Sequence, residues 1–174
     1  MSCTLVTAFY PIRSKFPPTQ YMEWAKNYMT LHSPIVLFTE EHLAPVFQAM
    51  RPSHLPLHIV VLPFQELETW SGDYPEKWRE QHALNPEGHI QGQVNGHITQ
   101  QTAELYAVWA HKPAFVEQAI RLNPFSTEFF FWCDIGAFRS PPCPQVQERF
   151  PESKGLMRTR LLLQSIAPVA PHEK

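Results

Sequence analysis

The stretch EFFFWCDIGAFR, from Glu128 to Arg139, decides how the fold is interpreted. Its run of four aromatic residues followed by a cysteine predicts a fully buried strand in the centre of a sheet, because aromatic residues favour strands and an unbroken apolar run suits a strand covered on both faces. The run ends at Asp134, where a buried charge without a partner would be costly. Asp134 therefore either closes a turn or meets a cation.

Upstream of this stretch, strand and helix patterns alternate. A helix begins in the region of Thr19, which is the expected N-cap, and Pro45 interrupts the pattern of a second helix. This order predicts a single α/β domain with a mostly parallel central sheet flanked by helices. The strands are expected over 4–10, 34–42 and 57–63, and the helices over 20–31 and 40–50.

The middle of the chain has a weaker pattern. Residues 66–99 hold four of the six glycines, and we expect a long, partly irregular excursion there. Helical spacing returns over 99–112, and Pro113 predicts a break between two helices at Lys112, because proline disfavours a helical conformation at the residue before it. Three aromatic residues match buried faces and are expected in the core, namely Trp24, Tyr106 and Trp109.

Composition excludes several classes of function. The 14 Lys and Arg residues are scattered and are outnumbered by 16 Asp and Glu, which disfavours nucleic acid as a partner. No apolar run reaches the roughly 18 residues that span a bilayer, and the first residues resemble a strand more than a signal peptide. We therefore expect no membrane span and a cytoplasmic protein. Cys3, Cys133 and Cys143 lack CxxC spacing, and Cys133 is expected to be a buried, inert thiol.

Asp134 is the main candidate for chemistry, because ligands of open parallel sheets bind beyond the carboxyl ends of the strands. Mg²⁺ or Mn²⁺ is commonly held by one or two carboxylates together with substrate phosphates. Gly136 would let the backbone approach a diphosphate or adopt a positive φ, although a simple strand-ending turn explains the same residues. Tyr10, just past the first strand, could cradle a base or pack a turn. No GxSxG or P-loop motif supports a hydrolase or kinase.

A set of residues in one register resembles the HtrL/YibB family, together with the opening stretch TLVTAFYPIRSKF. The likeness covers most of the chain from Thr4 to Arg139. It implies a glycosyltransferase-like protein with a GT-A type, Rossmann-like domain over 1–140 that binds a nucleoside-diphosphate sugar. The residues in register are Tyr106, Trp109, Lys112, Asn123, Pro124, Phe125, Trp132, Asp134, Gly136 and Arg139.

The same resemblance implies a donor site. Asp134 would take the place of the metal-binding acid in the family's variant of the DxD motif, with Mn²⁺ or Mg²⁺ as cofactor, and Gly136 stands where the last acid of that motif would be. Lys112 could offer its charge to phosphate or lie solvated at a helix end. The nucleoside would lie against the first strand and its loop, at Thr7, Ala8, Phe9, Tyr10 and Ile12.

Residues 141–174 are expected to form a short proline-rich tail. Because GT-A enzymes commonly place the acceptor site after the acid motif, the resemblance also implies that much of the C-terminal acceptor half is missing. Three functions are consistent with these observations. They are sugar transfer to an unknown glycan or other acceptor, donor binding by a catalytically incomplete remnant, and a protein-interaction domain on the same fold.

Overall fold

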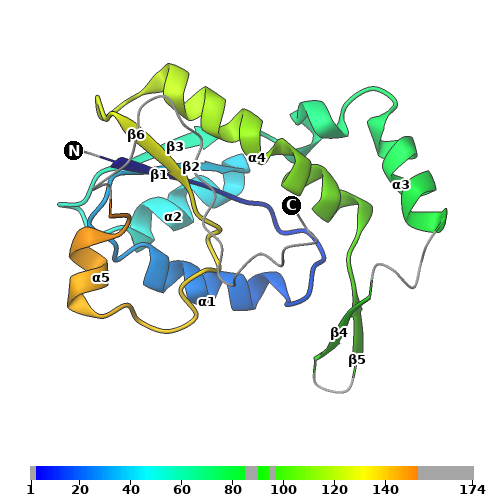
Figure 1. The fold of residues 1–174 in the computed structure, drawn as a ribbon, viewed down its shortest axis with the longest axis horizontal. Coiled ribbons are helices and arrows are strands. Elements are labelled where there is room, and N and C mark those ends of the chain that lie inside the picture. Colours follow the sequence, from blue (N-terminus) through cyan, green and yellow to red (C-terminus); the bar gives the residue numbers. More distant parts are fainter. Residues whose placement is uncertain (1–2, 85–89, 95–96, 153–174) are drawn as a thin grey trace, which may run out of the picture.

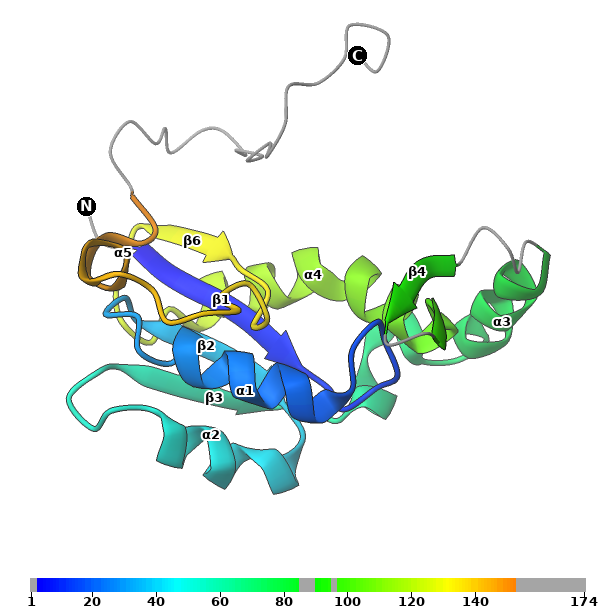
Figure 2. The ribbon, with the colours of Figure 1, turned by 90° about the horizontal axis from the view of Figure 1, so that it is seen from below.

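A computed structural model describes residues 3–84, 90–94 and 97–152 (Figure 1). Its core is a four-stranded sheet with the order β3-β2-β1-β6, and every neighbouring pair is parallel (Figure 2). The predicted α/β class with a parallel sheet is therefore confirmed, as a single Rossmann-like domain. The strands are β1 (Cys3–Phe9), β2 (Ile35–Thr39), β3 (Leu57–Val61) and β6 (Phe129–Trp132).

Helices cover both faces of this sheet. Helices α1 (Pro18–Tyr28) and α2 (Ala44–Met50) lie on one face, and α4 (Ala103–Leu122) lies on the other (Figure 1). Side chains alternate along β1, so that Leu5 and Phe9 pack on the α1 side, whereas the neighbouring Val6 packs on the α4 side. Burial of both faces explains why the strand sequences are almost continuously apolar.

Prolines lie in the first turns of α1 and α2. Pro18 is the first residue of α1 and follows Pro17, which makes no side-chain cap, so the predicted Thr19 N-cap is wrong. In α2, Pro45 lies in the first turn, directly after a 3₁₀ turn over Glu41–Leu43, and does not interrupt the helix. Proline is tolerated in a first turn because the N–H that it lacks has no helical partner there.

Helix α4 runs unbroken through Pro113, so the predicted break at Lys112 is wrong. Proline leaves the carbonyl four residues earlier without its helical donor, which costs about 3 kcal/mol. Packing of one continuous face offsets that cost, because Ala107, Phe115 and Ala119 are fully buried against the sheet. Thr102 caps the helix by accepting a hydrogen bond from the Leu105 N–H (3.2 Å).

Residues 66–99 are more regular than the sequence predicted. Helix α3 (Tyr74–Leu84) and a hairpin of β4 (Ile90–Val94) and β5 (His97–Gln100) lie together at one end of the molecule (Figure 1). Two short 3₁₀ turns, Phe64–Glu66 and Glu68–Trp70, precede them. Helix α3 buries none of its residues, so it shows no apolar stripe by which a sequence pattern could reveal it.

Strand β6 corrects a further expectation. Within the described part of the chain it forms the edge of the sheet and pairs with β1 alone, rather than lying at the centre. Its four residues are accordingly half-buried, not fully buried. The aromatic run therefore forms an edge strand of the sheet.

The chain after β6 returns to the opposite end of the strands. Helix α5 (Pro144–Arg149) is followed by Phe150, whose ring packs edge-on against Phe131 of β6 with 5.6 Å between the ring centroids. The Ser33 hydroxyl donates a hydrogen bond to the Phe150 carbonyl (2.6 Å). The part of the predicted tail that is described, up to residue 152, thus contains a packed helix. None of the helices in the described ranges has the length and hydrophobicity needed to cross a membrane.

A buried arginine ties the amino ends of the strands together. Arg51 is 4% exposed, and its guanidinium donates to the carbonyls of Met29, Leu31, Ser33 and Pro56 at 2.7–3.0 Å. These carbonyls lie in the segments that lead into β2 and β3. Burial lowers the pKa of Arg51 to about 10, which leaves the side chain charged at neutral pH.

Candidate functional site

The strand order creates a topological switch point next to β1. The chain builds β1, β2 and β3 in one direction across the sheet and then returns through α4 to place β6 on the other side of β1. The carboxyl ends of β1 and β6 therefore flank the point at which the strand order reverses, and the Cys133 N–H is bonded to the Val6 carbonyl there (3.0 Å). Open α/β sheets bind their ligands at this switch point.

An open groove of about 1350 Å³ lies at this position and extends along the border formed by β6 and α4. It is larger than the roughly 300–1,000 Å³ of common small-molecule sites. Seven of the eight residues predicted for the donor site line it, namely Ala8, Phe9, Tyr10, Ile12, Lys112, Asp134 and Gly136. Thr7 does not, because its side chain is completely buried within the sheet.

The centre of this groove is an ion pair between α4 and the turn that follows β6. Lys112 Nζ lies 2.8 Å from Asp134 Oδ1 and donates to Oδ2 at 3.1 Å. The indole N–H of Trp132 donates to the same Oδ1 at 3.0 Å. Both oxygens of the carboxylate therefore face donors. Asp134, the acid that follows the aromatic strand, therefore pairs with a cation, which is one of the two roles expected from the sequence.

Exposure makes this ion pair easy to open. The Asp134 side chain is 63% exposed, whereas that of Lys112 is 27% exposed because neighbouring groups cover its stem. Pairs with one partner in solvent contribute about 0–1 kcal/mol to stability. Ligand binding could therefore rearrange the pair at low cost.

An aromatic stack holds the lysine in position. Lys112 Nζ lies 5.4 Å from the centroid of the Trp132 ring, within the range of a cation–π contact. Trp132 in turn stacks on the buried Phe115, with 5.7 Å between centroids and 14° between ring planes. The ammonium group thus lies over the Trp132 ring, which the core holds in place through Phe115.

Tyr10 is a structural residue of the groove wall. Its ring packs against Phe64 and Phe115, and its hydroxyl donates to the Leu62 carbonyl (3.0 Å). Burial raises the pKa of Tyr10 above its usual value, so the hydroxyl stays protonated. Of the two roles that the sequence left open, the packing role is the one the contacts support.

Gly136 is required by packing rather than by a positive φ. Gly72 has a φ in the left-handed region (+59°), whereas Gly136 does not. A Cβ at Gly136 would lie 2.9 Å from Tyr21 Cδ1 and 3.1 Å from Trp24 Cε3. The turn after Asp134 therefore lies directly against the aromatic side chains of α1.

Arg139 is a groove residue that the sequence reasoning did not assign to the site. Its guanidinium lies 4.8 Å from the Trp24 ring centroid and 5.2 Å from that of Phe16. It makes no ion pair with the acids of the described residues. The sequence signal for this residue is a positive charge shortly after the turn over 134–136. Trp109, expected in the core, is 38% exposed and also lines the groove.

The carboxylates of the groove bear on metal binding. Asp134 and Glu117 are the acids that line it, and Glu117 pairs with Arg121 at 2.8 Å. In the described ranges no cluster of three His, Cys, Asp or Glu residues could hold a metal ion. A divalent cation bound at Asp134 would have one protein carboxylate as ligand and would meet the Lys112 ammonium.

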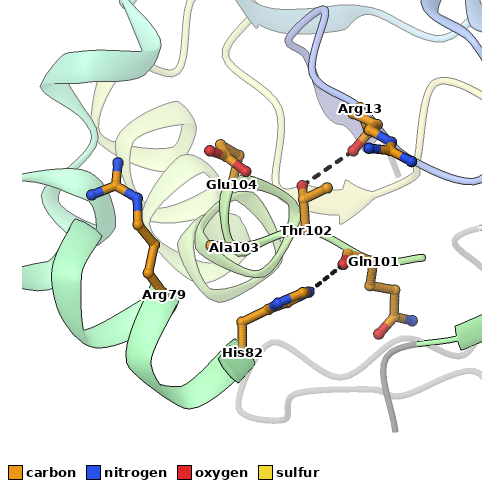
Figure 3. Close-up of a pocket in the computed structure, with 7 residues that line it drawn as sticks. All are labelled: Arg13, Arg79, His82, Gln101, Thr102, Ala103 and Glu104. Carbon is orange, nitrogen blue, oxygen red and sulfur yellow. Dashed lines mark hydrogen bonds between the residues drawn. The ribbon is translucent and has the colours of Figure 1, made fainter. Parts of the chain in front are cut away.

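A second, smaller cavity of about 260 Å³ lies where α3 meets the start of α4 (Figure 3). Arg13 and Arg79 line it, and His82 Nε2 lies 2.6 Å from the Gln101 carbonyl oxygen. Figure 3 shows that the two guanidinium groups point in different directions and do not converge on a common point. Both arginines are exposed, and the cavity does not form an anion site.

Comparison with known proteins gives no relative for this chain: neither the protein-family models nor the curated proteins nor the solved structures include a match.

Proposed function

We propose that this chain binds a nucleoside-diphosphate sugar in the groove at the carboxyl ends of β1 and β6 and transfers the sugar to an acceptor. The observation that carries the proposal is the meeting of Lys112 and Asp134 at the switch point of a parallel sheet. These two residues lie where such sheets bind nucleotides, and they offer polar contacts within a mainly aromatic and aliphatic surface. The resemblance to glycosyltransferase-like proteins points to the same ligand.

The groove offers contacts for each part of a donor of this kind. Trp109, Phe130 and Trp132 are exposed or half-buried and present apolar surface on which a base could stack. Lys112 and Arg139 carry the positive charges that a diphosphate requires. Charge on the leaving diphosphate has two available partners here, namely Mn²⁺ or Mg²⁺ at Asp134, or the Lys112 ammonium.

Donor binding without turnover is the second candidate. Of the two acids that line the groove, Asp134 is paired with Lys112, and Glu117 is paired with Arg121. A general base for an acceptor hydroxyl would first have to leave its cation. Donor binding without turnover therefore stands beside transfer as the second candidate, because the acids of the groove are both paired.

Calorimetric titration with a panel of nucleoside-diphosphate sugars, with and without Mn²⁺, tests the proposal. We expect the intact chain to bind a donor and Asp134→Ala to bind it with altered affinity, weaker if Asp134 holds a metal and stronger if Asp134 competes with the phosphates for Lys112. Asp73→Ala is the matched control, because Asp73 forms an exposed ion pair with Lys77 on α3, away from the groove. Sugar transfer or donor hydrolysis, followed by chromatography, separates the transferase from the remnant. Failure of every donor to bind would reject both and favour a protein-interaction domain.

A further inference from the structure

We propose that Lys112 is the built-in cation of this groove: it neutralises Asp134 in the free protein and passes to the phosphates of a bound diphosphate, so that binding needs no divalent metal. The inference rests on the proposed function, since it assumes that the groove receives a diphosphate. It adds that the Lys112 ammonium neutralises the negative charge of the diphosphate. It also predicts that Asp134 competes with the ligand instead of recruiting it through a metal.

The contacts of Asp134 are the first observation. Lys112 Nζ is within 3.1 Å of both carboxylate oxygens, and the Trp132 indole N–H takes up a further position on Oδ1. A divalent cation would need those same oxygens and would bring its charge next to the ammonium group. Because the ammonium group and the metal ion are both positive and would lie side by side, Lys112 disfavours metal binding at Asp134.

The fixed position of the ammonium group is the second observation. Lysine usually loses much side-chain freedom when it binds a ligand, but the stem of Lys112 is already mostly covered. Its Nζ lies over Trp132, which stacks on the fully buried Phe115. The group carries three donors, so it can contact a phosphate oxygen while it still touches the carboxylate.

The balance of charge in the groove is the third observation. The charged residues that line it are Lys112, Glu117, Asp134 and Arg139. Lys112 pairs with Asp134, and Glu117 pairs with Arg121. Arg139 contacts aromatic rings and no acid among the described residues, which leaves one uncompensated positive charge in the groove. This surplus favours an anionic ligand.

Titration with inorganic pyrophosphate in the presence of EDTA tests the inference, because this probe has neither a base nor a sugar. We expect the full chain to bind it without metal. Lys112→Met should weaken binding by roughly ten-fold to a hundred-fold, as for loss of a charged hydrogen bond, and Lys112→Arg should restore part of it. Lys77→Met is the matched control and should bind like the unchanged protein, because it breaks an exposed ion pair on α3.

Asp134→Asn separates the two modes of binding by the sign of its effect. If Lys112 is the cation, this variant frees the ammonium and strengthens pyrophosphate binding in EDTA. If Asp134 recruits a metal, the same variant loses the binding that the unchanged protein shows with Mn²⁺. The inference is overturned if pyrophosphate binds only with Mn²⁺ or not at all, if Lys112→Met binds normally, or if Asp134→Asn loses binding.

These results are distinguishable from those that test the proposed function. Pyrophosphate binding through Lys112 without binding of any nucleotide sugar would uphold the role of the lysine and reject the sugar donor. Nucleotide-sugar binding that requires Mn²⁺ would uphold the donor and reject the metal-free mode.

Discussion

Lys112 in α4 and Asp134 after β6 are 22 residues apart in the sequence, and their charged groups meet at 2.8 Å. Two long-range features are needed for this contact, namely the unbroken course of α4 through Pro113 and the placement of β6 beside β1. Formation of this ion pair therefore depends on the fold as well as on the residues of the groove. Its exposure predicts a small contribution to stability, as distinct from the role in ligand binding that we propose for it.

A double-mutant cycle tests that distinction. Lys112→Met, Asp134→Asn and the double variant are each expected to change the free energy of unfolding by less than about 1 kcal/mol, with a coupling energy of similar size, because one partner is largely in solvent. Urea unfolding monitored by circular dichroism measures all three. A coupling energy of several kcal/mol would show that the pair is a structural element instead.

Gly136→Ala should destabilise the fold by about 1–3 kcal/mol, the usual cost of overpacking. The added Cβ would lie 2.9 Å from Tyr21 and 3.1 Å from Trp24, which are themselves packed against each other. Thermal unfolding gives the measurement. In a Tyr21→Ala background the same change should cost less, because part of the obstructing ring is gone. Equal costs in both backgrounds would contradict the contact.

Arg51→Met should lower the free energy of unfolding by about 3–5 kcal/mol. Removal of the guanidinium leaves four carbonyls without their donor in a buried position. Arg121→Met is the control, since Arg121 is exposed and pairs with Glu117 within one helix, where such pairs are worth about 0.3–0.5 kcal/mol. Similar losses in the two variants would contradict the anchoring role of Arg51.

Native thiol reactivity should be confined to Cys143. Cys3 and Cys133 are buried, and burial raises their pKa values to about 11 and about 12, so both remain protonated thiols in the folded protein well above pH 9. Iodoacetamide at pH 9.5, followed by peptide mass spectrometry, should modify Cys143 alone, and all three after unfolding. Modification of Cys133 in the folded state would contradict its burial.

The same thiols predict how stability depends on pH. The folded pKa values lie above the value of 9.0 expected for an unburied thiol, so the folded chain keeps protons that the unfolded chain loses. The stabilisation from the two protonated thiols is complete below about pH 9 and is lost as the pH rises towards 11–12. Urea titrations at pH 8 and pH 10 should therefore show a lower free energy of unfolding at pH 10. Cys133→Ala should reduce that difference.

The sequence predicted the sheet because its strands carry their own signal. Residues of β1 and β2 are buried on both faces, and such strands appear as short apolar runs whatever their neighbours are. The position of Asp134 at a carboxyl end followed from the same pattern. The edge position of β6 did not, because an aromatic run has the same composition at the border of a sheet as at its centre.

Other features depended on contacts that a local pattern does not contain. Helix α3 buries none of its residues fully and packs through few apolar side chains, among them Trp78, whose indole donates to the Thr69 carbonyl (2.7 Å), so hydrophobic spacing does not reveal it. The break predicted at Pro113 was wrong because burial of Phe115 and its neighbours outweighs the local preference of proline. The contact of Arg139 with Trp24 joins the segment after β6 to the distant helix α1, and a local sequence pattern does not contain it.

Arg51 and the groove lie at opposite poles of the sheet. The arginine fastens the segments that enter β2 and β3, whereas the groove opens where β1 and β6 end. The contacts of Arg51 are therefore separate from the charged residues that line the groove. Substitutions of the charged groove residues should therefore leave the four hydrogen bonds of Arg51 in place.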